Sequence, residues 1–148
     1  IDQPKNNRSS SVAVGLFHPM AFRDSKYAWA GKDTYEEALD FYSATFPSFK
    51  LHTTQHHAEP HDALIMLATF SIRGQELMIS DSPIEHEWAI TPGVSFFLDI
   101  DNETNLLSLA EQLSDEGKVM MPPGNYGFSK QFAWVEDRFG INWQLNVE

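Results

Sequence analysis

The sequence predicts an α+β fold in which one βαβββ unit occurs twice along the chain. Short runs rich in β-branched and aromatic residues alternate with helical periodicity in the order β-α-β-β-β, and this order is repeated after a linker. Two related hexapeptides support the repeat. GQELMI begins at Gly74 and GINWQL at Gly140, 66 residues later, and each opens the last strand of its unit.

In the first unit, residues 12–22 are predicted to form the first strand, with Pro19 marking an edge or a bend. Asp33 and Glu36 have the spacing of a helix-capping pair. The apolar residues that follow recur at helical spacing until Pro47: Tyr35, Ala38, Leu39, Tyr42 and Phe46. Three strands are expected at residues 50–57, 63–72 and 75–80.

The second unit is predicted to begin with a strand at residues 93–100. Asn102 is expected to cap a helix and Gly117 to end it. The apolar face of this helix is predicted to consist of Leu106, Leu109, Ala110 and Leu113. Three further strands are expected at residues 119–121, 130–136 and 141–147.

The domain organisation follows from this order of elements. Residues 1–11 are polar and are expected to form a flexible tail. Residues 12–148 are predicted to form a single domain, with unit one at about 12–82, a linker at 83–91 and unit two at about 92–148.

Composition excludes several classes of partner. With 21 acidic and 10 basic residues the net charge is −11, which disfavours nucleic acid and anionic membranes because both are bound through basic residues. There is no cysteine, hence no disulfide, thiolate metal site or cysteine nucleophile. No 18-residue apolar run and no signal peptide is recognised, so a cytoplasmic protein is expected.

Four segments together resemble the PhnB-like family of the vicinal-oxygen-chelate (glyoxalase/bleomycin-resistance/dioxygenase) superfamily. They are ALDFY at 38–42, GQELMISDSP at 74–83, TPGVSFFLDID at 91–101 and the long stretch at 121–145. Members of this family often carry the name 3-demethylubiquinone-9 3-methyltransferase. The resemblance implies a glyoxalase/bleomycin-resistance fold, in which two curved mixed sheets surround a cleft, and a homodimer.

Methyl transfer is not supported by the residues. A methyl-donor cofactor is usually held by a glycine-rich turn between a strand and a helix of a parallel sheet. The chain has no such turn. We therefore expect no cofactor.

The resemblance also indicates where metal ligands would lie, at the first and last strand of each unit. These positions hold His18, Met78, Gly93 and Gln144. Only His18 is a good ligand, because divalent ions prefer imidazoles and charged oxygens. We expect no metal, with His18 as the weak candidate and Glu76, two positions from Met78 on the same face, as a weaker one.

Strand alternation predicts that Leu77, Ile79, Trp143, Leu145 and Val147 pack under the helices, and it predicts which side chains face the cleft. The candidates are His18, Met20, Glu76, Met78, Ser95, Phe97, Tyr126, Phe128, Trp134, Asn142 and Gln144. The glycine-rich loop at 122–130 is either a lid carrying Tyr126 and Phe128 or a plain β-connection, and Trp134 is either a pocket or a core residue. Such a mixture of apolar and polar groups suits a small organic ligand.

Two other groups of residues bear on possible chemistry. His52, His56, His57 and His61 have a spacing seen in zinc sites, but a solvated hairpin tip is the favoured interpretation. The DRFG run at 137–140 is predicted to be a hairpin turn with Arg138 exposed. No catalytic residue is identified, because no candidate acid or base has a visible titratable partner.

Three functions therefore stay open. The favoured one is a metal-independent protein that binds a small molecule in the cleft. The second is an enzyme: a metal-dependent lyase, isomerase or dioxygenase using His18, or a metal-free enzyme with Glu76 or His18 as the base. The third is a dimer with a purely structural or interaction role.

Overall fold

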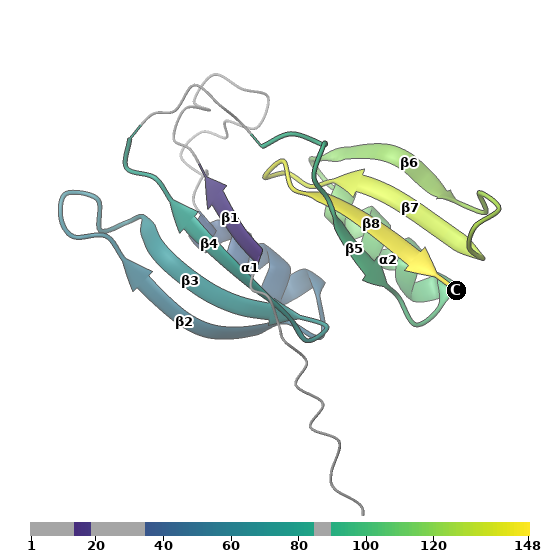
Figure 1. Cartoon of the computed structure of the whole chain (residues 1–148), viewed down its shortest axis with the longest axis horizontal. Helices are drawn as coiled ribbons and strands as arrows, with labels where there is room; N and C mark the ends of the chain where they lie inside the picture. The colour runs from purple at the N-terminus through teal and green to yellow at the C-terminus, as the bar shows by residue number, and fades with distance from the viewer. Residues whose placement is uncertain (1–13, 19–34, 85–89) are drawn as a thin grey trace, which may run out of the picture.

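The computed structural model describes residues 14–18, 35–84 and 90–148, with side chains from residue 36 onward. The first unit contains β1 (Val14–His18), α1 (Tyr35–Thr45), β2 (Lys50–His56), β3 (Ile65–Ile72) and β4 (Gln75–Asp81). The second contains β5 (Phe96–Asp99), α2 (Glu103–Ser114), β6 (Lys118–Gly124), β7 (Gln131–Glu136) and β8 (Asn142–Val147). The predicted repeated order β-α-β-β-β is confirmed (Figure 1).

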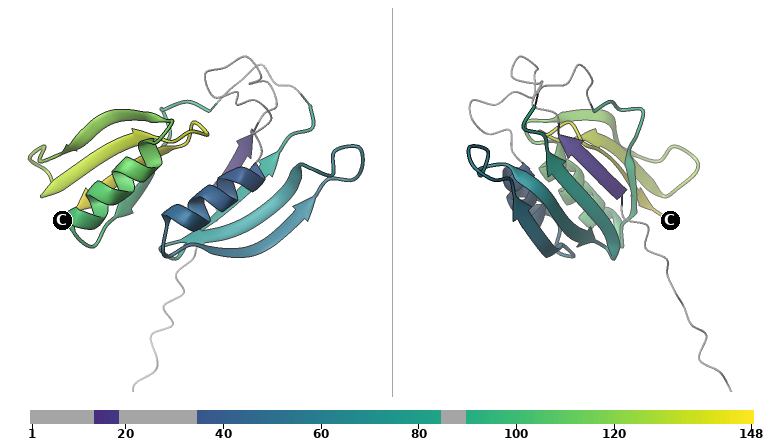
Figure 2. Two further views of the ribbon diagram at one scale, coloured as in Figure 1. Left: turned by 180° about the vertical axis from the view of Figure 1, so that it is seen from behind. Right: turned by 60° about the vertical axis from the view of Figure 1, so that its left-hand side comes forward.

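Each unit forms one four-stranded mixed sheet. The strand orders are β1-β4-β3-β2 and β5-β8-β7-β6. The first and last strands of each unit pair in parallel, and the remaining pairs are antiparallel. One helix covers one face of each sheet, and both helices lie on the same side of the molecule (Figure 2). The α+β fold class is therefore confirmed, and in the described part of the chain each sheet keeps an open face without a helix.

The core lies between the helices and the sheets, and alternation along the closing strands fills it. Leu77 and Ile79 of β4 are buried, and so are Trp143, Leu145 and Val147 of β8. The apolar face of α2 is buried as predicted, and Asn102 caps this helix through an Asn105 N–H···Oδ1 bond of 2.9 Å. These contacts confirm the inward-facing set expected from the sequence.

The two units share part of this core. Tyr42 of α1 and Phe46, which directly follows the helix, pack on the ring of Trp143 in β8, with centroid separations of 5.5 and 5.0 Å. Phe96 of β5 contacts the same indole at 5.2 Å. Aromatic side chains from both units therefore meet on one residue, which fixes α1 against the second sheet.

Several element boundaries differ from those predicted. β1 is described at Val14–His18, while residues 19–22 and the predicted cap Asp33 lie outside the described residues. β5 begins only at Phe96, and β6 extends to Gly124 although it contains two prolines. Prolines are tolerated there because β6 is an edge strand. Within the described ranges, no helix combines the length and apolarity needed to cross a bilayer.

The end of α2 corrects the role expected of Gly117. The left-handed residue after the helix is Glu116, with φ of 59°, and Gly117 N–H bonds to the Ser114 carbonyl. Gly117 is required for a different reason: a Cβ at this position would overlap the carbonyl oxygen of Glu136. The glycine therefore serves a close approach of backbones and not the left-handed turn.

Candidate functional site

The open face of the second sheet brings together most of the predicted cleft residues. Phe97 is the register partner of Gln144, which in turn is opposite Trp134. Because cross-strand partners share a face, these three side chains lie in a row across β5, β8 and β7. Ser95, two residues before Phe97, joins them through a Gln144 Nε2–H···Oγ bond of 2.7 Å.

Polar side chains on this face are already bound to one another. Trp134 donates its indole N–H to Asn142 Oδ1 at 2.9 Å, and Asn142 donates to Glu136 Oε2 at 3.3 Å. Asn142 and Glu136 are buried, whereas Trp134 is half-buried. The Trp134 ring therefore lies on the open face, and its indole N–H is fixed by a hydrogen bond to Asn142. Asn142, predicted to line the cleft, takes part mainly by holding that indole in place.

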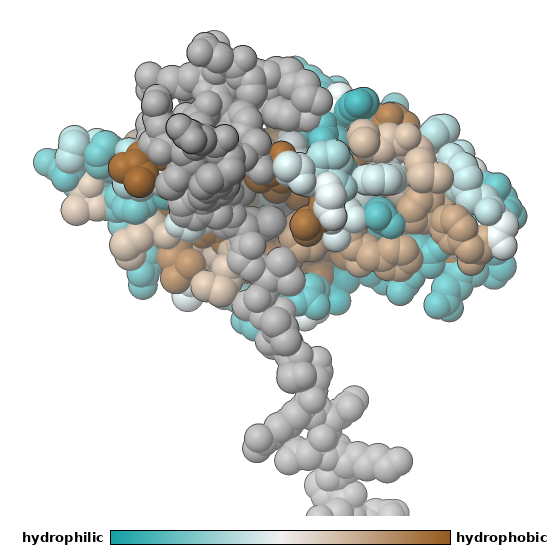
Figure 3. Space-filling model, turned by 45° about the horizontal axis from the view of Figure 1, so that its top comes forward, coloured by the Kyte–Doolittle hydropathy of each residue, from teal (hydrophilic) through white to brown (hydrophobic). Residues whose placement is uncertain are grey.

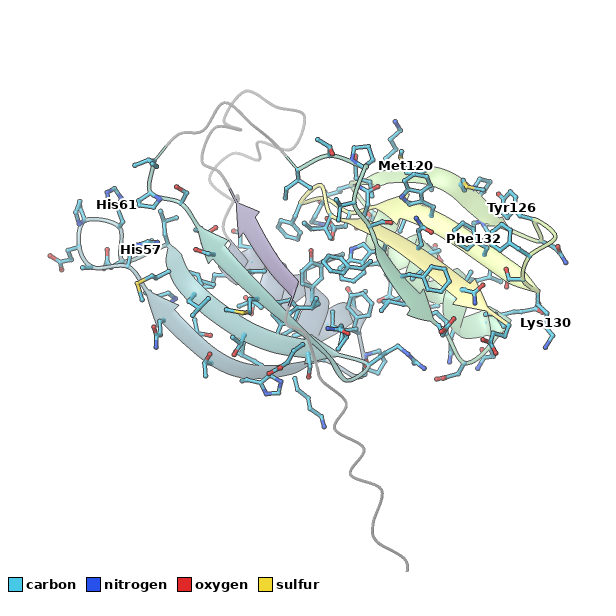
Figure 4. The ribbon with its side chains drawn as sticks, in the orientation of Figure 1. His57, His61, Met120, Tyr126, Lys130 and Phe132 are labelled. Carbon is cyan, nitrogen blue, oxygen red and sulfur yellow. The ribbon has the colours of Figure 1, made fainter. Side chains whose placement is uncertain are left out.

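Exposed aromatic rings lie at both ends of the face, with Phe97 on β5 and Tyr126 and Phe128 at the β6–β7 end. Phe97 is 55% exposed, Tyr126 40% and Phe128 65%. Tyr126 and Phe128 stack with centroids 6.3 Å apart, and both meet the edge of Phe132, at 6.1 and 5.0 Å. Figure 4 shows Tyr126 beside Phe132 at the β6–β7 end of the sheet. In Figure 3 apolar surface gathers over the second sheet, with hydrophilic surface along its rim.

The loop between β6 and β7 is held in a defined shape. Tyr126 donates its hydroxyl to the Pro122 carbonyl at 2.7 Å, and the Gly127 N–H donates to Asn125 Oδ1 at 2.8 Å. Gly127 has a φ of 91°, a conformation that favours glycine. The rings of Tyr126 and Phe128 therefore pack against Phe132 of the same sheet, in an arrangement that exists without a ligand.

The first sheet also has an open face, and it is more polar. Glu76 and Met78 of β4 are half-buried there, opposite Ser71 and Thr69 of β3. The backbone of His18 ends β1 as the register partner of Asp81. Met20 lies outside the described residues.

The residues that the resemblance assigned to metal-ligand positions are mostly poor ligands. Gln144 uses its amide nitrogen on Ser95, Met78 offers a thioether, and Gly93 has no side chain. Among the residues described by the structure, no three His, Asp or Glu side chains come together to hold a metal ion.

The four histidines on β2 and its hairpin have different local partners. His52 Nε2 lies 3.1 Å from Ser71 Oγ, and His57 Nε2 lies 2.9 Å from the carbonyl oxygen of Asp81. Figure 4 shows His57 and His61 at the hairpin tip, far from the aromatic rings of the second sheet.

One buried acid was not anticipated from the sequence. Asp137 is fully buried at the start of the predicted DRFG turn. Its Oδ2 accepts from the Tyr42 hydroxyl at 2.7 Å and from the Trp143 indole at 2.9 Å. Its Oδ1 accepts from the N–H groups of Phe139 and Ile141. Burial raises the pKa of Asp137 to about 6, against the opposing effect of these four donors.

Asp137 lies in the shared core and not on an accessible surface, where its bonds to Tyr42 and Trp143 join the two units. Arg138 beside it was expected to be exposed but is only partly so. Its guanidinium lies 4.7 Å from the Phe41 ring centroid and pairs with Asp115 and Glu116.

A hollow lies on the helix side, between the end of α1 and α2. Its volume is about 410 Å³, and its floor includes Phe46 and Leu109. Arg73, in the β3–β4 turn of unit one, forms an ion pair with Asp101 of unit two. The Arg73 Nη2 atom lies 2.7 Å from Asp101 Oδ1. This hydrogen bond lowers the pKa of Asp101 and raises that of Arg73. The guanidinium that lines the hollow is therefore already paired with a carboxylate.

Comparison with known proteins gives both a family and a fold. A family model described as 3-demethylubiquinone-9 3-methyltransferase matches residues 26–146. The chain is similar to a PhnB protein from Bacillus cereus that provisionally carries the same methyltransferase name. Identity is 27%, the TM-score is 0.77, and 93% of this chain and 98% of that chain are covered.

Two further solved structures share the fold. A Pseudomonas aeruginosa protein has 23% identity and a TM-score of 0.74, over 93% of this chain and 97% of its own. A glyoxylase/bleomycin resistance protein/dioxygenase domain from Frankia has 13% identity and a TM-score of 0.57, with 93% and 94% covered. No curated protein matches the sequence.

Proposed function

The chain belongs to the 3-demethylubiquinone-9 3-methyltransferase family, in its PhnB-like form with the glyoxalase/bleomycin-resistance fold, and we propose that it binds a small aromatic or apolar molecule without a metal. The proposed site is the open face of the second sheet. The observation that carries the proposal is the row Phe97–Gln144–Trp134, in which a polar amide lies between two aromatic side chains. This pattern provides apolar contact together with a few placed polar groups.

Preorganisation of this face supports the proposal. Gln144 is held by Ser95, and the Trp134 indole is held by Asn142. The carbonyl oxygen of Gln144 is an acceptor whose direction the Ser95 bond fixes. Fixed side chains lose little conformational entropy when a ligand binds, so affinity is gained without new contacts.

We also propose that the chain does not transfer methyl groups, despite the family's name. Within the described residues each sheet contains one parallel strand pair, and β5 leads into α2 through Ile100, Asp101 and Asn102, without glycine. A doubly wound parallel sheet with a glycine-rich phosphate turn is the usual support for a nucleotide-type cofactor.

A homodimer is proposed as the assembly.

The metal-dependent alternative rests on His18 alone. Its proposed partners, Met78 and Gln144, are neutral side chains that bind hard or borderline divalent ions poorly. Elemental measurement of protein purified without a histidine tag separates the two proposals. Stoichiometric metal that is lost in His18→Ala would contradict metal-free binding.

The proposed function is tested by a thermal-shift screen of small aromatic and apolar metabolites, followed by calorimetry on each compound that raises Tm. We expect Gln144→Leu to weaken binding about 10-fold or more, as expected for losing one buried hydrogen bond to a ligand. Gln112→Leu, on the exposed side of α2, is the matched control and should leave affinity unchanged. A ligand whose affinity is unaffected by both changes would place the site elsewhere.

A further inference from the structure

The outer edges of the two sheets differ in sequence. The outer strand of the first sheet is β2, and that of the second sheet is β6 (Figure 1). β6 carries Pro122 and Pro123 and shows two register shifts against β7. Prolines and bulges are the usual protection of an edge against pairing with another chain. β6 is therefore protected against pairing with a strand of another chain.

β2 also shows two register shifts, against β3, but it lacks the prolines of β6. Its sequence, KLHTTQH, contains no proline and no carboxylate, and its one lysine stands at its first residue. All seven residues are exposed, including Leu51 at 50%. In the described part of the chain no strand pairs with the outer side of β2, so its backbone N–H and C=O groups there form a template for adding another strand.

Charge favours a second copy of the chain along this edge. The chain carries a net charge of −11, so most of its surface repels another copy. Because β2 lacks carboxylates, two copies that approach along β2 avoid placing acids opposite one another. The exposed Leu51 adds apolar area that such pairing would remove from water.

The edge is also held rigid. On its open face, His52 Nε2 lies 3.1 Å from Ser71 Oγ and Thr53 Oγ1 lies 2.7 Å from Thr69 Oγ1. Both side chains are thereby turned toward β3 and away from the free edge. Beyond the far end of β2, the His57 imidazole bonds to the Asp81 carbonyl. A preformed strand pays little ordering entropy when it pairs.

We propose that β2 pairs antiparallel with β2 of a second copy about a two-fold axis, joining the first sheets of two chains into one continuous sheet. The inference rests on the homodimer proposed above and names its surface. A two-fold axis is the commonest symmetry of soluble dimers, and antiparallel pairing of identical strands satisfies it directly. The open faces of the two first sheets then form one continuous surface. The aromatic face of each second sheet is left uncovered and can still bind a ligand.

The chain has no cysteine, so single-cysteine variants test this surface cleanly. The variants are His52→Cys, Thr53→Cys and Thr54→Cys, with Val119→Cys on β6 as the exposed control. A symmetric antiparallel pair places one position opposite its own copy, within disulfide distance. We expect rapid covalent dimer after mild oxidation for at least one β2 variant and none for the control.

The second measurement is the mass in solution by light scattering, with circular dichroism to confirm folding. Wild type and Val119→Lys should have the mass of a dimer, and Thr54→Lys should be a folded monomer because it places a like charge on each of the two paired strands. A dimer that survives Thr54→Lys and cross-links at no β2 position would overturn this surface but leave the proposed dimer standing. A monomeric wild type would overturn both.

Discussion

Replacing Asp137 by asparagine should change how the stability of the protein depends on pH. The buried carboxyl has a pKa of about 6, against 3.8 for the free group. Because a tenfold change in an equilibrium constant is worth about 1.4 kcal/mol, ionising this carboxyl at neutral pH costs the folded state about 3 kcal/mol relative to the protonated form. Its stabilising contribution is complete below pH 3.8 and is lost as the pH rises through 6.

When the pH falls from 7 to 5, the free energy of unfolding of the wild type should therefore rise by about 1 kcal/mol from this group alone. Asparagine does not titrate, so Asp137→Asn lacks this gain. The variant is also less stable at every pH, because its amide nitrogen would face the Trp143 N–H, which is a donor.

The assay is urea unfolding of wild type and variant at pH 7, 6 and 5, with the free energy of unfolding from linear extrapolation. Subtracting the two curves removes the contribution of the other carboxyl groups and histidines. The difference in the free energy of unfolding between wild type and variant should increase by about 1 kcal/mol toward pH 5. A gap that is constant, or that narrows as the pH falls, would refute the argument that burial dominates over the four hydrogen-bond donors.

Two further predictions concern residues of the second unit, each with a control variant. Gly117→Ala should destabilise the fold by about 2 kcal/mol or more because its Cβ overlaps the Glu136 carbonyl, whereas Gly74→Ala, with free space but a φ of 81°, should cost only about 1 kcal/mol. Equal losses of Tm would contradict the close approach. Asn102→Ala should lower stability by about 1 kcal/mol through loss of the α2 cap, while the exposed Asn105→Ala should lie within about 0.5 kcal/mol of wild type. Both pairs are compared by calorimetric melting.

Much of the fold could be predicted because it is encoded locally. Helical spacing before Pro47 and after Asn102 identified both helices, and alternation identified the buried faces of β4 and β8. Gly117 shows the limit of local reasoning. A glycine after a helix suggests a left-handed cap, but the tertiary approach of Glu136 determines why glycine is needed.

The site was harder to predict for a similar reason. Alternation placed Phe97, Trp134 and Gln144 on one face, which their register supports. It did not anticipate that Asn142 is buried beneath the Trp134 indole. Nor did it find Asp137, because an acid before Arg-Phe-Gly is typical of an exposed turn and its partner Tyr42 is 95 positions away. Hydrogen bonds over such separations leave no local pattern.

The most direct test of ligand binding on the open face of the second sheet is nuclear magnetic resonance of the labelled protein with a compound from the thermal-shift screen. The Gln144 side-chain amide and the Trp134 indole N–H are reporters on that face, and the Gln112 amide is the reporter on the helix side. The expected result is saturable shifts of the first two signals, with Gln112 unchanged. Shifts confined to Gln112, with no change at Gln144 or Trp134, would contradict the proposed site.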